Sequence, residues 1–96
     1  MAKAYWICLY RSVSNPAALS AYAAAAGPAI QAAGGRFVVR GMPAKTYEAG
    51  KDQRTVIVEF DSLQQAVAAY EGDVYQAALK LLAGGAERDL RIIETV

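Results

Sequence analysis

The chain has 96 residues, a formal net charge of +1 and a hydrophobic fraction of 55%, values typical of one globular domain spanning residues 1–96. This hydrophobic fraction excludes intrinsic disorder, and the near-zero net charge provides no overall attraction for nucleic acid or for an anionic membrane. No run of about 18 apolar residues is present, so we predict no membrane-spanning segment.

Two residue types are scarce enough to exclude whole classes of chemistry. The chain has no histidine and one cysteine, Cys8, so it cannot form a Ser-His-Asp or Cys-His pair or the usual zinc ligand sets. No glycine-rich phosphate loop appears either. We therefore predict neither a metal nor a cofactor. A lone cysteine and a start unlike a signal peptide favour a cytoplasmic protein.

The first half of the chain predicts a strand, a helix and a second strand. Residues 3–11 are apolar on both alternating sets, which is typical of a strand covered on both faces. Asn15 and Pro16 form a helix start, and a glycine pair at 34–35 ends that helix. Pro28 predicts a kink or split near Gly27. Residues 36–40 predict the second strand, and we expect this strand to resume at residues 45–48 after a bulge.

The second half predicts a strand, two helices and a last strand. The side chains of residues 54–60 alternate clearly between the two faces of a strand. The face that carries Ile57 also carries a charge, Glu59. Ser62 begins a capping box for one helix, and Asp73 is expected to cap the next. A second glycine pair, at 84–85, ends that helix, and residues 89–95 predict the last strand.

This βαββαβ order predicts the ferredoxin-like α+β fold, a four-stranded antiparallel sheet with its helices on one face. The other face would be bare, although strand residues on both faces are apolar. A large bare apolar face is rare on a monomer, so we predict a homodimer that packs sheet against sheet. The alternative is a monomer whose sheet is partly wetted.

The chain also resembles a small bacterial family of about this length, a domain of unknown function within the dimeric α/β-barrel superfamily. The resemblance covers essentially the whole chain, and its most specific parts are the runs Gly34-Gly35-Arg36 and Val56-Ile57-Val58-Glu59-Phe60. Further matching positions are Tyr5-Trp6, Asn15-Pro16, Tyr22, Val39-Arg40-Gly41, Glu48, Tyr75-Gln76 and Arg88. Tyr70 and Glu48-Ala49 depart from the family pattern.

What the resemblance implies is a dimer whose two sheets enclose a barrel-like space. It implies no activity, since the family has no established one. The wider superfamily includes cofactor-free monooxygenases, haem-degrading enzymes, lactone isomerases and ligand-sensing modules, and a shared fold does not determine function.

Glu59 is the first candidate for catalysis. A carboxylate on the inter-subunit face would lose solvent, which raises its pKa unless a cation pairs with it. Arg36, Arg40 and Arg54 are the available cations at strand ends. Glu59 as an acid or base, with Arg36 or Arg54 holding an anion, would form a catalytic site. The alternative is a structural salt bridge that fixes the register of the dimer.

Four further residues are candidates for ligand binding: Trp6, Tyr22, Arg40 and Tyr75. The two tyrosines lie within apolar helix stripes, so core packing with a hydrogen-bonded hydroxyl is the alternative for each. Trp6 could line an aromatic pocket or fill the sheet face. Two functions therefore stay open: a cofactor-free enzyme acting on a small organic molecule in a pocket between sheet and helices, or a dimeric module without catalysis, either ligand-binding or purely structural.

Overall fold

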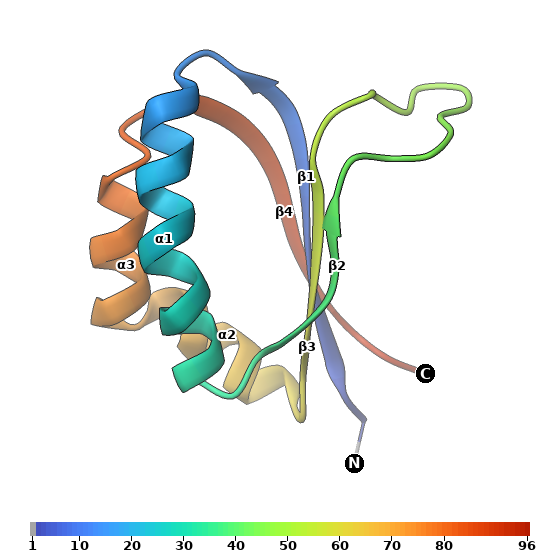
Figure 1. Cartoon of the computed structure of the whole chain (residues 1–96). Helices are drawn as coiled ribbons and strands as arrows, with labels where there is room; N and C mark the ends of the chain where they lie inside the picture. Colours follow the sequence, from blue (N-terminus) through green and yellow to red (C-terminus); the bar gives the residue numbers. More distant parts are fainter. Residues whose placement is uncertain (1) are drawn as a thin grey trace.

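The computed structural model describes residues 2–96 as one four-stranded sheet with three helices. In chain order the elements are β1 (Ala4–Val13), α1 (Pro16–Ala32), β2 (Arg36–Gly41), β3 (Thr55–Phe60), α2 (Leu63–Glu71), α3 (Asp73–Lys80) and β4 (Ala86–Glu94). The strands pair antiparallel in the order β2-β3-β1-β4. All three helices lie on one side of the sheet (Figure 1). The protein thus has the predicted ferredoxin-like α+β fold.

The helix-side face of the sheet supplies the core. Alternate residues of β1 are buried there, and Trp6 at its centre is 1% exposed. Its ring packs against Phe60, Tyr70 and Tyr75, with centroid distances of 6.1, 5.6 and 4.8 Å. The period-2 alternation of a strand places these side chains on one face. The core is therefore aromatic where β1, β3, α2 and α3 meet.

The predicted caps Asn15 and Ser62 and the end of α1 are confirmed, whereas the helix predicted to end at the glycine pair 84–85 already ends at Lys80. Asn15 Oδ1 accepts a hydrogen bond from the Ala18 amide at 3.1 Å, and Ser62 Oγ accepts one from the Gln65 amide at 3.1 Å. Gly34 ends α1 with a left-handed φ of 97°, a conformation that glycine adopts without steric cost. No helix within residues 2–96 is long and apolar enough to cross a membrane.

Three further local predictions differ from the structure. Of the kink or split predicted near Gly27, the split does not occur, because the exposed Pro28 removes one backbone bond from a long alanine-rich helix that continues to Ala32 (Figure 1). Residues 45–48 lie in the loop 42–54 rather than in a resumed strand, and Glu48 has a left-handed φ of 54°. Gly72, not Asp73, is the cap of α3, while Asp73 lies inside the first turn, where the helix dipole favours a negative charge.

The strand boundaries also differ, in the direction of longer strands. β1 extends to Val13 through a register shift between Tyr10 and Ser12, and β4 begins at Ala86 rather than at residue 89. The two strands therefore pair beyond the predicted limits. This extension adds Arg88 to the sheet, opposite Tyr10.

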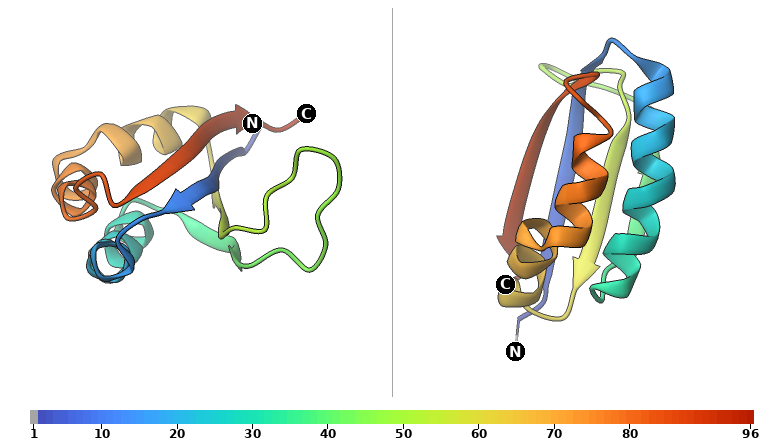
Figure 2. Two further views of the ribbon diagram at one scale, coloured as in Figure 1. Left: turned by 90° about the horizontal axis from the view of Figure 1, so that it is seen from above. Right: turned by 90° about the vertical axis from the view of Figure 1, so that its left-hand side faces the viewer.

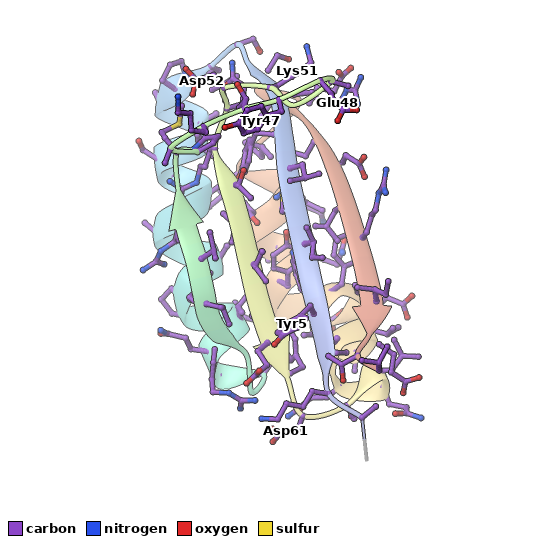
Figure 3. All side chains as sticks on the ribbon, turned by 90° about the vertical axis from the view of Figure 1, so that its right-hand side faces the viewer. Tyr5, Tyr47, Glu48, Lys51, Asp52 and Asp61 are labelled. Carbon is purple, nitrogen blue, oxygen red and sulfur yellow. The ribbon has the colours of Figure 1, made fainter. Side chains whose placement is uncertain are left out.

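The second face of the sheet, here called the open face, carries no helix (Figure 2). Register places Ile7 beside Ile57, which in turn pairs with Val39, and Tyr5 beside Ile93. Val39 and Ile93 are 41% and 57% exposed. The loop 42–54 projects from one end of this face, away from the helices, whereas Tyr5 and Asp61 lie toward the other end (Figures 1 and 3).

Candidate functional site

A pocket lies between α1 and the helix-side face of the sheet. The pocket is open to solvent, and the empty space of about 410 Å³ in and in front of it includes that solvent. Aromatic rings from three elements line it: Trp6 and Tyr10 of β1, Tyr22 of α1 and Phe37 of β2. We call it the arginine pocket, because three arginines also line it: Arg40, Arg54 and Arg88.

The composition of α1 explains why space remains here. The helix presents Ala23, Ala26 and Gly27 to the pocket, at spacings of one helical turn or one residue. None of these three side chains is larger than a methyl group, so α1 leaves space in front of the sheet between Tyr22 and Ile30. The alanine-rich sequence therefore serves the pocket as well as the helix.

Arg88 is the central polar residue of the pocket. Its Nη1 donates to the Tyr22 hydroxyl at 3.1 Å and, weakly, to Cys8 Sγ at 3.5 Å, and its Nη2 donates to the Tyr75 hydroxyl at 3.3 Å. The guanidinium also lies 5.0 Å from the centroid of the Tyr22 ring and 5.7 Å from that of Tyr10. A guanidinium has five N–H donors, so two remain for a ligand.

The charge of Arg88 is not balanced by a carboxylate within residues 2–96. Burial lowers the pKa of its guanidinium, but the neighbouring tyrosine and cysteine groups raise it by more, so the group stays protonated. A half-buried cation surrounded by neutral partners is costly, and an anionic ligand would reduce that cost.

The other titratable groups beside Arg88 are neutral donors. Burial raises the pKa of the Tyr22 hydroxyl well above its usual value, and it also raises the pKa of Tyr75 and of the Cys8 thiol. The two tyrosine hydroxyls share a hydrogen bond of 2.6 Å, in which either can donate. If Tyr75 donates, the proton of Tyr22 is left for an acceptor in the pocket.

The residues lining the pocket include no aspartate or glutamate, so the described chain places no carboxylate base there. Nor does any group of three or more His, Cys, Asp or Glu side chains within residues 2–96 come together as a metal site. The pocket is thus equipped to hold an anion and to donate hydrogen bonds to it, but not to accept a proton by a carboxylate.

Glu59 and Arg36 lie elsewhere, on the open face. Arg36 donates to Glu59 Oε1 from Nε at 3.1 Å and from Nη2 at 3.0 Å, and also reaches Asp61 at 2.9 Å. Lys3 and the Tyr5 hydroxyl donate to the same carboxylate at 3.3 and 3.2 Å. Arg36, followed by Lys3 and Tyr5, holds the pKa of Glu59 below its usual value.

The structure therefore separates residues that the sequence analysis combined. Trp6, Tyr22, Arg40 and Arg54 line one pocket, with Tyr75 hydrogen-bonded behind Tyr22. The expected pocket that combined Glu59 with Arg54 is not formed, because β3 directs alternate side chains to opposite faces and Glu59 faces away from the helices. A catalytic acid or base at position 59 would need a carboxylate without a paired cation, whereas Glu59 is paired with Arg36 and Lys3.

Arg88 is the candidate site residue that the sequence analysis missed. It was noted as a position matching the family, but the predicted last strand began one residue after it. The missed signal was the alternation of Arg88, Leu90 and Ile92, which places an arginine in line with two half-buried apolar residues. A charge on the covered face of a strand marks a site or a salt bridge.

The fold and this pocket define the class of protein: a small ferredoxin-like α+β protein with an arginine-lined pocket under its first helix. Residues 3–96 match the family model described as "Domain of unknown function (DUF1330)", and the chain belongs to that family. Comparison with curated protein sequences gives no match.

Solved structures share the fold at low sequence identity. A protein of unknown function from Rhodopseudomonas palustris is 20% identical, with a TM-score of 0.73 over 99% of this chain and 83% of that one. A dimeric ferredoxin-like protein of unknown function from Thermobifida fusca is 18% identical, with a TM-score of 0.68 over 98% and 92%. SnoaB, a cofactor-independent oxygenase from Streptomyces nogalater, is 12% identical, with a TM-score of 0.63 over 100% and 95%.

Proposed function

We propose that the protein binds a small, flat organic anion in the arginine pocket. The observation that carries this proposal is Arg88, a half-buried guanidinium bonded to two tyrosine hydroxyls and without a carboxylate partner in residues 2–96. Aromatic walls suit a flat body, since rings stack on rings. The guanidinium and a hydroxyl suit a carboxylate, phenolate or enolate oxygen.

Binding of benzoate and 4-nitrophenolate tests this proposal. Both are flat monoanions, and binding of either would shift amide and indole NMR signals of the pocket, including those of Trp6. We expect Arg88→Gln to weaken binding at least about tenfold, the effect of losing one charge-assisted hydrogen bond. Arg88→Lys, which keeps the charge, should retain part of the affinity. Absence of binding by wild type, or equal binding by wild type and Arg88→Gln, would overturn the proposal.

A second candidate is cofactor-free catalysis in the same pocket. Two observations favour it: the fold is shared with a cofactor-independent oxygenase, and Arg88 with Tyr22 could stabilise the oxyanion of an enolate or phenolate. Since the pocket lining holds no carboxylate base, the substrate would have to be acidic enough to bind already ionised. Its proton would then leave to water rather than to a side chain.

The absorbance of 4-nitrophenol measures this activation directly, because its ionised form is yellow. If the pocket stabilises the anion, added protein raises the ionised fraction at fixed pH, and Arg88→Gln does not. Oxygen uptake with enolisable ligands that bind then distinguishes an oxygenase from a binding module. Binding with no change in ionisation and no turnover would leave only the binding function.

We also propose that the protein is a homodimer formed through its open face. That face exposes apolar side chains, Ile7 and Ile57 on the central strands and Val39 and Ile93 on the edge strands, and charged pairs lie beside them. An apolar centre within a polar rim is the usual anatomy of an interface. The dimeric neighbour from Thermobifida fusca has the same fold. Analytical ultracentrifugation of the wild type checks this state directly.

In this dimer Glu59 and Arg36 would act as a rim salt bridge that fixes register, rather than as a base and an anion clamp. Their mutual bonds and the lowered pKa of Glu59 support that role. We keep the cytoplasm as the proposed location, since the buried thiol of Cys8 fits a reducing compartment. Neither nucleic acid nor a membrane surface is proposed as a partner.

A further inference from the structure

We propose that the natural ligand of the arginine pocket carries two anionic groups, one held by Arg88 and the other by Arg40 and Arg54. This inference rests on the proposed binding function and specifies its ligand class: a flat dianionic organic acid, such as a conjugated dicarboxylate or a ring with a carboxylate and a phenolate.

The first support is how the six arginines of the chain are distributed. Three of them form ion pairs: Arg11 with Glu87, Arg36 with Glu59 and Asp61, and Arg91 with Asp89. The three that line the pocket form none with any carboxylate in residues 2–96. The arginines without a protein anion are therefore gathered around one cavity rather than scattered over the surface.

Three cations around one pocket repel one another, and one monovalent anion would neutralise a third of this charge. Two anionic groups would neutralise two thirds of it and leave a single positive charge. Among the described residues, no aspartate or glutamate lines the pocket to balance this charge. Charge balance alone thus favours a dianion over a monoanion.

The second support is the positions of these arginines on the sheet. Tyr10 pairs with Arg88 of β4 on one side, and on the other side its amide donates to the Arg54 carbonyl at 3.0 Å. Because neighbouring strands lie about 4.8 Å apart, the backbones of Arg54 and Arg88 are about 10 Å apart, with Tyr10 between them. The two arginines therefore start from backbone positions on either side of Tyr10.

The two ends of the pocket also differ in environment. The Arg88 head group is tied to Tyr22 and Tyr75, beneath the helices. Arg40, on the edge strand β2, is exposed and stacks 4.2 Å from the Phe37 centroid, while Arg54 is half-buried at the end of the loop 42–54. A flat ligand lying over Tyr10 would place one anionic group at Arg88, deep in the pocket, and the other at Arg40 and Arg54, near its mouth.

Terephthalate and isophthalate, compared with benzoate, test this inference. They share one ring and one carboxylate with benzoate and add a second carboxylate at different positions. We expect the better dianion to bind wild type at least about tenfold more tightly than benzoate does, through the added charge-assisted bonds. In the double variant Arg40→Gln/Arg54→Gln this ratio should fall close to one, with circular dichroism confirming the fold.

Arg11→Gln is the matched control, because it removes one positive charge from an arginine outside the pocket and should leave the ratio unchanged. If wild type binds benzoate and both dianions equally, or if the double variant keeps the ratio, the dianion inference is wrong while the binding function stands. If none of the three binds wild type, the binding function itself fails. Calorimetry at fixed ionic strength gives all the affinities.

Discussion

The two faces of one sheet treat charge in opposite ways. On the open face, arginines meet carboxylates at 2.9–3.0 Å, as Arg36 does with Glu59 and Asp61. On the helix-side face, Arg88 meets tyrosine hydroxyls and a thiol instead. The same strands supply both sets of residues, since alternate side chains point to opposite faces.

This difference separates the charges that are paired with carboxylates in the folded protein from those that are not. A cation that already pairs with a carboxylate in the folded protein contributes little free energy to binding a further anion. A half-buried cation among neutral donors contributes much more. The open face also keeps aliphatic residues exposed, while the helix-side face buries its aromatic residues. We therefore assign assembly to the first face and ligand binding to the second.

The largest effect we expect comes from the helix-side core. Trp6→Ala removes an almost fully buried ring in contact with three other aromatic residues, so the free energy of unfolding should fall by about 3–5 kcal/mol. Urea denaturation at fixed protein concentration measures this loss. Ile93→Ala on the open face is the control at a protein concentration low enough to dissociate the proposed dimer, and its expected loss is smaller because Ile93 is 57% exposed in the single subunit. Equal losses would contradict the contrast between the faces.

Next in size is the effect of a charge among the apolar residues of the open face. Ile93→Asp should weaken the proposed dimer about 100-fold or more, because two-fold symmetry places the new charge in the interface twice. The fold of each subunit should survive, since Ile93 contributes little to the core of one chain. Sedimentation gives the dissociation constant, and circular dichroism gives the fold. An unchanged dimer would place the interface elsewhere.

The sequence predicted the fold well, because periodicity and capping are local. The alternation of residues 54–60 and the Asn15 and Ser62 caps required no knowledge of distant residues. The site was harder to predict, because it depends on register and on which face each strand presents. Glu59 stood out as a charge within an apolar strand, yet its partners Lys3 and Arg36 come from other strands or their ends.

Two variants that each remove one tyrosine hydroxyl compare the two faces through a smaller expected effect. Tyr22→Phe removes the partner of both Tyr75 and Arg88, so the free energy of unfolding should fall by about 1 kcal/mol. Benzoate affinity should fall as well. Tyr5→Phe removes a single bond to Glu59 at 3.2 Å on the open face, and its effect should be smaller and leave benzoate binding intact. The reverse order would contradict the assignment of the two faces.

The smallest effect concerns Glu59, and its dependence on pH has a definite sign. Arg36 is the main cause of the lowered pKa of Glu59 in the folded state, so the unfolded chain takes up the proton first as the pH falls. The ion pair therefore stabilises the fold fully above the usual carboxyl range and loses this contribution as the pH falls through the lowered folded pKa.

Glu59→Gln should accordingly be slightly less stable than wild type at neutral pH, and the difference should vanish in strong acid. Urea midpoints measured from about pH 7 down to about pH 2 follow it across the carboxyl range. Asp61→Asn is the control, because Asp61 shares Arg36 but is 70% exposed at its side chain, and its difference should be smaller still. A Glu59→Gln difference that persists in strong acid would mean that the carboxylate acts through packing rather than through its charge. The ion pairs of the open face would then no longer differ in kind from the neutral contacts around Arg88.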